Sequence, residues 1–305
     1  MEIWGKSKAI HGTWFFLPEF KLLLDAGEGA SSSLGIHGSD IETVFISHTH
    51  LDHIAGLVTI GRFQKRTLKN EPNRRLCRVL YHRDCEKKIH LLKKFLEDFY
   101  VRLDFIEIED GEDFLIKKNT FLRVFKVDHN ASYYRQKITS VGCHIVEKRT
   151  RLKSKVLKEQ KRIKAQYKDP KAAQKKITEW ILKLKKEQGE AGICEEYDHI
   201  RLSYCGDSRP VNPSLLKGTE VLMHEATFID PVDMEAAHSC VGEVVSLAKK
   251  VKCKALVIYH LSERYKRELP NYKEVIFQIA KKKKLDCPLF IVGIDEFFRK
   301  KIKIN

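Results

Sequence analysis

Short apolar runs, each followed by polar or glycine-rich sequence, divide the first part of the chain. Their length and their content of β-branched and aromatic residues predict buried strands. These runs are residues 20–25, 43–47, 78–81, 105–108 and 121–127. Residues 86–100 differ, because an apolar residue recurs there at every third or fourth position, which predicts a helix.

The same alternation returns near the end of the chain. Strands are predicted at residues 201–205, 220–223 and 255–259, and a helix at residues 241–250. Strands that alternate with helices are typical of an α/β fold. No internal repeat is visible in the sequence.

The residues between these two parts are unusually basic. Residues 148–188 contain 16 Lys or Arg and 4 Asp or Glu, so this segment carries most of the net charge of +16. Asp169-Pro170 divides it, because a proline disfavours helix in the residue before it. Downstream, one apolar helix face is formed by Ile177, Trp180, Ile181 and Leu184.

We therefore expect residues 148–192 to form an inserted arm of two helices that fold on each other and project from the main domain. Residues 1–147 and 193–305 would form that domain. A positive field of this size favours a polyanionic partner, of which nucleic acid is the usual one, over a solvated helical hairpin.

Composition limits the remaining classes of protein. A hydrophobic content of 43% and an aromatic content of 10% suit a globular protein with a core. No stretch of about 18 apolar residues occurs, so no membrane span is expected. The start of the chain does not resemble a secretory signal, and the 8 cysteines include no CxxC pair. Reduced thiols in a cytoplasmic protein are expected.

Five of the predicted strands end at a residue that can bind a metal ion or transfer a proton. These residues are His48, His129, Asp207, His224 and His260. Strand ends lie at the rim of a sheet, where side chains from distant parts of the sequence meet. Imidazole and carboxylate groups suit zinc, although manganese and iron accept the same ligands. A buried imidazole in the core is an equal alternative for His224.

The densest group of such residues is His48-Thr49-His50-Leu51-Asp52-His53, directly after a buried strand. His48 and His50 are two residues apart and project from one side of an extended turn. Asp52 and His53 begin the next helix and face a second ion. Asp52 is placed to orient or deprotonate a water molecule. This pattern predicts a metal-dependent hydrolase with two metal ions.

These residues resemble the signature loop of the metallo-β-lactamase superfamily, and later motifs resemble its ribonuclease Z branch, endonucleases that trim transfer-RNA 3′ ends. The later motifs are Asp25-Ala26-Gly27, Val127-Asp128-His129, Gly206-Asp207-Ser208, His224-Glu225-Ala226-Thr227-Phe228, Ala237-His238-Ser239 and His260-Leu261-Ser262-Glu263-Arg264-Tyr265. They occur in order over most of the chain.

The resemblance implies a four-layer αββα sandwich with two zinc ions, and a homodimer as in the family. It implies that one ion is held by His48, His50 and His129, that the other is held by Asp52, His53 and His260, and that Asp207 bridges them. It also implies Asp52 as general base and His238 as proton donor. Glu225 would take part in catalysis, chiefly as the buried partner that orients His238.

Other candidate residues would contact the substrate. Ser262 and Arg264 would bind a phosphate, although Arg264 equally suits a structural ion pair. Precursor transfer RNA would contact the arm through phosphate-binding residues, namely Lys153, Lys155, Lys161, Arg162, Lys175 and Lys176.

Some motifs differ from the ribonuclease Z pattern. Leu51 replaces the usual glycine, and the inserted arm carries Asp169-Pro170 where the family has a Gly-Pro motif. Two alternatives therefore stay open. The first is a hydrolase of the same fold that acts on a small phosphodiester, such as a cyclic nucleotide, or on a lactone. The second is a nucleic-acid-binding protein whose hydrolase site is vestigial.

Overall fold

The computed structural model describes residues 1–70, 75–129, 139–231 and 237–304, which divide into two units. The larger unit contains Met1–Val146 and Ile200–Asn305, and the smaller unit contains Glu147–His199. Among the described residues, no helix combines the length and the apolar composition needed to cross a bilayer.

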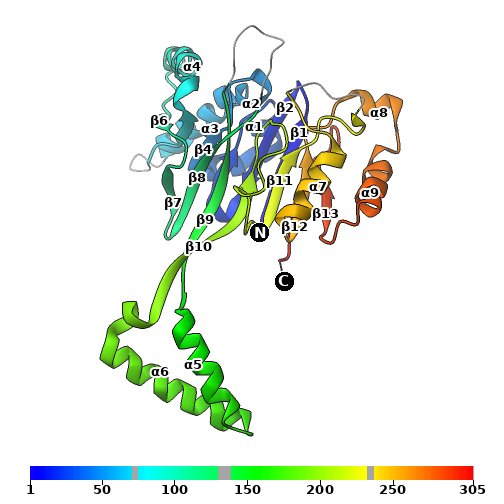
Figure 1. The fold of residues 1–305 in the computed structure, drawn as a ribbon. Helices are drawn as coiled ribbons and strands as arrows, with labels where there is room; N and C mark the ends of the chain where they lie inside the picture. Colours follow the sequence, from blue (N-terminus) through cyan, green and yellow to red (C-terminus); the bar gives the residue numbers. More distant parts are fainter. Residues whose placement is uncertain (71–74, 130–138, 232–236, 305) are drawn as a thin grey trace. The chain divides into compact units, whose positions relative to one another are not determined.

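The first sheet contains seven strands in the described part of the chain (Figure 1). In spatial order they are β14 (Phe298–Lys301), β1 (Glu2–Lys8), β2 (Gly12–Leu17), β3 (Leu22–Leu24), β4 (Thr43–Ile46), β5 (Arg78–His82) and β6 (Asp104–Ile108). The strands from β14 to β3 pair antiparallel, and those from β3 to β6 pair parallel. The parallel half brings the carboxyl ends of β3 and β4 to one edge.

The second sheet also has seven strands. Their order is β13 (Leu289–Ile291), β12 (Ala255–Tyr259), β11 (Val221–Glu225), β10 (Cys194–Tyr204), β9 (Ser140–Leu152), β8 (Thr120–Val127) and β7 (Asp113–Lys117). Strands β10 to β13 pair parallel, so that their carboxyl ends also share one edge.

Three separate apolar clusters show how the layers pack. The first, which includes Phe45 and Met223, joins the facing sides of the two sheets. The second packs the outer side of the second sheet against α7 (Val241–Val251) and α9 (Tyr272–Lys282). The third packs the outer side of the first sheet against α1 (Ala30–Leu34) and α3 (Leu57–Asn70). The expected αββα sandwich is therefore confirmed.

The alternation of side chains along β4 explains why consecutive residues from Val44 to Ile46 are all apolar. Val44 and Ile46 belong to the cluster under the helices, whereas Phe45 belongs to the cluster between the sheets. Both faces of the strand are buried, so the three residues after Thr43 are all apolar. Further short elements are α2 (Leu51–Ile54), α4 (Glu86–Asp98), α8 (Arg264–Glu268), and the 3₁₀ turns Pro18–Phe20, Gly35–Asp40 and Arg83–Cys85.

The smaller unit contains α5 (Ser154–Ala165) and α6 (Pro170–Ile193), joined to the ends of β9 and β10. Asp169 caps α6, because its carboxylate accepts the backbone N–H groups of Lys171 and Ala172. Val156, Ala173 and Ile177 are buried between the helices.

The expectation of two helices from residue 148 is wrong at the start of the segment, because β9 continues to Leu152. Basic residues of β9 pair there with acidic residues of β10: the Lys148 Nζ to Asp198 Oδ1 distance is 2.6 Å, and the Arg151 Nε to Glu195 Oε1 distance is 2.8 Å. Over Glu147–His199, 16 basic residues stand beside 9 acidic ones, so this unit is less positive than residues 148–188, which contain the same basic residues but only 4 acidic ones.

Gly56 lets the start of α3 approach the backbone after β3. A Cβ atom at Gly56 would lie 2.3 Å from the carbonyl oxygen of Gly27 and 2.8 Å from that of Ala26. We expect Gly56→Ala to lower the stability by about 1–3 kcal/mol, because the backbone cannot yield as a flexible side chain would.

Thermal unfolding measures this effect, and Gly242→Ala is the matched control. A Cβ atom at Gly242 in α7 would meet only the Cε atom of Lys283, at 3.3 Å. The control should be neutral or slightly stabilising, since alanine favours helix. Equal melting temperatures for the two variants would contradict the close approach.

Candidate metal centre

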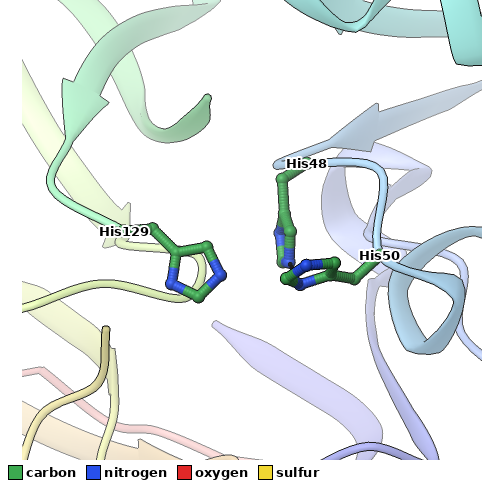
Figure 2. Close-up of side chains that lie close together, drawn as sticks. All are labelled: His48, His50 and His129. Carbon is green, nitrogen blue, oxygen red and sulfur yellow. Dashed lines mark hydrogen bonds between the residues drawn. The ribbon is translucent and has the colours of Figure 1, made fainter. Parts of the chain in front are cut away.

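Three imidazoles lie together at the end of the sandwich where β4 and β8 end. His48 and His50 come from the loop that follows β4, and His129 follows β8 (Figure 2). The His48 Nε2 to His50 Nδ1 distance is 2.8 Å. One nitrogen from each ring lies within 4.8 Å of the others, which is the spacing of a group that can share one ion. His48 and His129 are buried, so the group is enclosed by protein.

A second group lies beside the first. Asp52 and His53 come from α2, Asp207 follows β10 and His260 follows β12. The Asp207 Oδ2 atom lies 3.3 Å from His53 Nε2 and 3.2 Å from His260 Nε2. His260 Nε2 is 3.3 Å from Asp52 Oδ2.

Asp207 connects the two groups. Its Oδ2 atom is also 3.9 Å from His48 Nε2, which belongs to the first group. The side chain is almost fully buried, so its position is fixed by the surrounding sheet ends. A carboxylate in this place faces both ligand sets.

Hydrogen bonds on the far side of three of the rings orient these imidazoles. His53 Nδ1 lies 2.7 Å from Asp25 Oδ2, His260 Nδ1 lies 3.0 Å from Thr227 Oγ1, and His129 Nδ1 lies 3.1 Å from the carbonyl oxygen of Ala237. The Nδ1 atom of His129 must therefore donate, which leaves a lone pair on Nε2. This is the usual arrangement around ligands of a metal ion.

Unusual backbone conformations help to direct two of these residues. Asp25 has φ 54° and His260 has φ 64°, both in the left-handed region that residues other than glycine rarely adopt. They end β3 and β12, where the chain must leave the sheet sharply. Strain of this kind is concentrated at functional sites.

Several polar atoms in the two groups fit a metal ion. His53 Nε2, His129 Nε2 and Asp207 Oδ1 are buried and have no hydrogen-bond partner in the protein. A buried polar atom without a partner costs free energy, unless something else binds it. Because the donors are imidazole nitrogens and carboxylate oxygens, the arrangement fits divalent metal ions such as zinc.

The charges of the site are strongly coupled. Burial lowers the pKa of His50 to about 4 and lowers those of His48 and His129. Burial alone would raise the pKa of Asp52, but His53 and His260 lower it to about 2. Neutral imidazole at His48, His50 and His129 and ionised carboxylate at Asp52 are the forms that bind metal ions. At His53, burial would lower the pKa, but the neighbouring carboxylates raise it well above its ordinary value.

Glu225 and His238 form a pair next to the two groups. His238 Nδ1 lies 2.8 Å from Glu225 Oε1. Glu225 is fully buried, and its carboxylate also accepts the backbone N–H groups of Ser208, Thr227 and Ser239. Burial would raise the pKa of Glu225, but the imidazole of His238 lowers it.

The ring of His238 reaches the metal-capable groups. Its centroid is 5.4 Å from that of His260, with the rings stacked, and 5.0 Å from that of His129. The side chain is partly exposed, in contrast to Glu225. It is therefore oriented from the protein side and accessible from the solvent side.

The other candidate residues lie outside these groups. Ser262 donates its backbone N–H to the Thr227 carbonyl oxygen, and Arg264 lies over the rings of Phe228 and Tyr265. His224 is buried with its Nδ1 atom 2.8 Å from the Glu225 carbonyl oxygen, and it is not a member of the metal-capable groups found in the described residues. The six basic candidates of the arm belong to the smaller unit.

Sequence reasoning missed the supporting roles of Asp25 and Tyr204. The Asp25 carboxylate accepts the backbone N–H and the hydroxyl of Ser47, each at 2.7 Å, and the Tyr204 hydroxyl at 2.6 Å. The role of Asp25 could have been inferred from the sequence, because this aspartate directly follows a buried strand. In the sequence, Tyr204 cannot be distinguished from an ordinary apolar residue of a strand.

Comparison with known proteins identifies the family. A family profile described as "Anti-Pycsar protein Apyc1" matches residues 15–177, more than half of the 305-residue chain. The chain belongs to the Anti-Pycsar protein Apyc1 family. The matched residues of this Apyc1 family member include the loop of His48 to His53 and also His129.

Relatives and solved structures extend this result beyond the matched segment. The ribonuclease Z of Sulfolobus acidocaldarius is 25% identical over 277 residues, which cover 84% of this chain and 83% of that protein. YhfI of Bacillus subtilis, a metallo-β-lactamase fold protein, superposes with a TM-score of 0.61 at 13% identity and covers 98% of this chain and 100% of its own. The short form of human tRNase Z gives 0.59 at 16% identity, with 100% of both chains covered.

The expected resemblance is therefore confirmed: this Apyc1 family member has the metallo-β-lactamase fold, and curated relatives named ribonuclease Z align with most of its length. The function that the comparisons support at this level is that of a hydrolase with this fold. The name of the family and the names of the relatives differ, so they do not agree on one substrate.

Proposed function

We propose that the protein is a dinuclear metal phosphodiesterase and, more specifically, an endoribonuclease of ribonuclease Z type that cleaves precursor transfer RNA at its 3′ end. The observation that carries the proposal is the position of the Glu225–His238 pair beside two ligand groups that share Asp207. The alignment with relatives named ribonuclease Z supports the choice of substrate.

The grouping of neighbouring side chains supports an assignment of ligands to two ions. His48, His50 and His129 would hold one ion. The other would be held by Asp52, His53 and His260, with Asp207 between the two. Zinc suits these ligands, and manganese or iron would accept them. Such ions supply Lewis-acid stabilisation of the phosphoryl oxygens and an activated water.

The protein's own side chains would handle the protons. Asp52 is ionised and held between His53 and His260, so it can orient the attacking water and accept its proton. His238 is partly exposed and can protonate the departing ribose oxygen. The buried carboxylate of Glu225 holds the His238 ring by its Nδ1 atom, which leaves Nε2 to face the substrate.

The arm would bind RNA through its basic helices. Its helices carry most of the basic candidates, and their ion pairs are exposed, such as Arg162 with Glu159 at 3.7 Å and Lys176 with Glu179 at 3.6 Å. Exposed pairs of this kind contribute little free energy. Phosphate groups can therefore displace the acidic partners, and binding releases counterions.

The alternatives differ in what they predict for substrate size. A hydrolase for a small phosphodiester or a lactone would use the same metal groups and would not need the arm. A vestigial site would not need a complete ligand set, and the proximity of the candidate side chains within each group argues against this alternative. Turnover of a small phosphodiester and cleavage of a precursor transfer RNA distinguish these functions.

The first prediction concerns His238. We expect His238→Ala to retain the wild-type metal content and to lower kcat by roughly 10²–10⁴-fold, because the leaving group loses its proton donor. Metal analysis and turnover of a small chromogenic phosphodiester measure the two effects. His90→Ala, at an exposed position of α4, is the control and should leave both unchanged. Unaltered turnover in His238→Ala would remove it from the mechanism.

The second prediction concerns the arm. The backbone N–H of Lys153 donates to the Ile193 carbonyl oxygen at 2.9 Å, so the two strands are adjacent where α5 begins. An Asn-Gly turn can therefore replace residues 154–193. With zinc-loaded protein and a 3′-extended precursor transfer RNA, we expect wild type to cleave at the 3′ boundary. The shortened protein should need at least about tenfold more RNA for the same rate.

Charge-reversal variants provide a matched comparison in the complete chain. Lys175→Glu with Lys176→Glu should raise KM for the RNA, whereas Lys281→Glu with Lys282→Glu, the same charge change at the end of α9, should not. Cleavage of only a small diester by wild-type protein would contradict the ribonuclease Z proposal and favour a small substrate.

A further inference from the structure

The turn between β1 and β2 contains a residue whose identity neither the turn nor the core explains. Ile10 has φ 74°, in the left-handed region, which is especially unfavourable for a β-branched side chain. Glycine or asparagine would adopt this conformation more readily. The core does not require isoleucine either, because the side chain is 87% exposed.

Hydrogen bonds to the metal centre and its surroundings hold this turn in place. The backbone N–H of Ile10 donates to Asp52 Oδ2 at 3.2 Å, and that of Ala9 donates to the Leu261 carbonyl oxygen at 3.3 Å. His11 Nε2 lies 2.8 Å from Glu263 Oε2. Ile10 is therefore fixed at the rim of the site, next to the carboxylate that we propose as general base.

Leu51 is a second exposed aliphatic residue at the same carboxylate. It directly precedes Asp52 in α2, and 76% of it is exposed, whereas Asp52 is only 9% exposed. Scattered apolar residues on a surface need no explanation. Ile10 and Leu51 differ from such residues because both adjoin Asp52. In addition, Ile10 is held there in a backbone conformation that isoleucine disfavours.

We propose that Ile10 and Leu51 form an apolar contact surface for the nucleobase of the nucleotide next to the cleaved phosphate. A base has an apolar face that packs on flat or aliphatic surfaces, whereas its phosphate would bind at the metal centre. The inference rests on the proposed function, since it assumes a nucleotide substrate. Ile10 and Leu51 would be the residues that favour a substrate with a nucleobase over a phosphate ester without one.

Calorimetric measurement of ligand binding to the zinc-loaded, full-length protein tests the proposed contact with the nucleobase without relying on turnover. The probes are adenosine 5′-monophosphate, which carries a base, and inorganic phosphate, which does not. In Ile10→Ala with Leu51→Ala, we expect the Kd of the nucleotide to rise about five- to tenfold, while the Kd of phosphate changes less than about twofold. Ile36→Ala, at another aliphatic residue that is 82% exposed, should alter neither.

A thermal measurement distinguishes this role from a structural one. Asparagine tolerates the left-handed region, so Ile10→Asn should raise the melting temperature by about 1–3 °C while weakening nucleotide binding. A marked fall in melting temperature would show that the turn itself requires isoleucine. An unchanged ratio of nucleotide to phosphate affinity in the double variant would overturn the proposal. Failure to cleave precursor transfer RNA, with this ratio altered as expected, would instead refute only the ribonuclease Z substrate.

Discussion

The rest of the site depends on the hydrogen bonds that the buried carboxylate of Asp25 accepts. Asp25 directly follows β3 and accepts hydrogen bonds from the backbone N–H and the hydroxyl of Ser47, which precedes the loop of His48 to His53. The hydroxyl of Tyr204 reaches it from the second sheet, and His53 Nδ1 lies 2.7 Å away. A fully buried carboxylate is tolerated only when such partners replace water. These contacts fix the loop, one ligand ring and the spacing of the two sheets together.

The clustering of like groups makes the site suitable for cations. Five histidines and two aspartates occupy a volume from which most water is excluded. Burial lowers the pKa of His48, and the pKa of Asp207 lies well below its ordinary value because His260 and His53 outweigh the effect of burial. The unpartnered atoms of His53, His129 and Asp207 are the expected result when groups are arranged for ions rather than for one another. Metal binding would therefore relieve an unfavourable arrangement as well as supply catalysis.

Much of this arrangement could be predicted from the sequence. Polar residues after apolar runs, such as His48, Asp207 and His260, mark strand ends because the last residues of these strands are buried on both faces. The strands β1, β2 and β9 were not predicted, because Lys6, Thr13 and Lys148 interrupt any simple apolar pattern. Thr13 contacts Ser7 of β1, and Lys148 pairs with Asp198 of β10, so partners from other strands explain these two polar groups.

Contacts made by backbone atoms are the least visible in a sequence. The amide of Ile10 reaches Asp52 across 42 residues, and no side-chain pattern predicts this bond. Likewise, the pairing of His238 with Glu225 was expected from family resemblance alone, since β11 and the start of α7 meet only in the folded chain.

The central claim is that one protein site holds two ions around Asp207. Anomalous X-ray diffraction at the zinc absorption edge, from crystals of zinc-loaded wild-type protein, tests it most directly. The account predicts two peaks about 3.5–4 Å apart. One should lie among His48, His50 and His129, and the other among Asp52, His53 and His260. A single peak, or ions bound away from Asp207, would contradict the account.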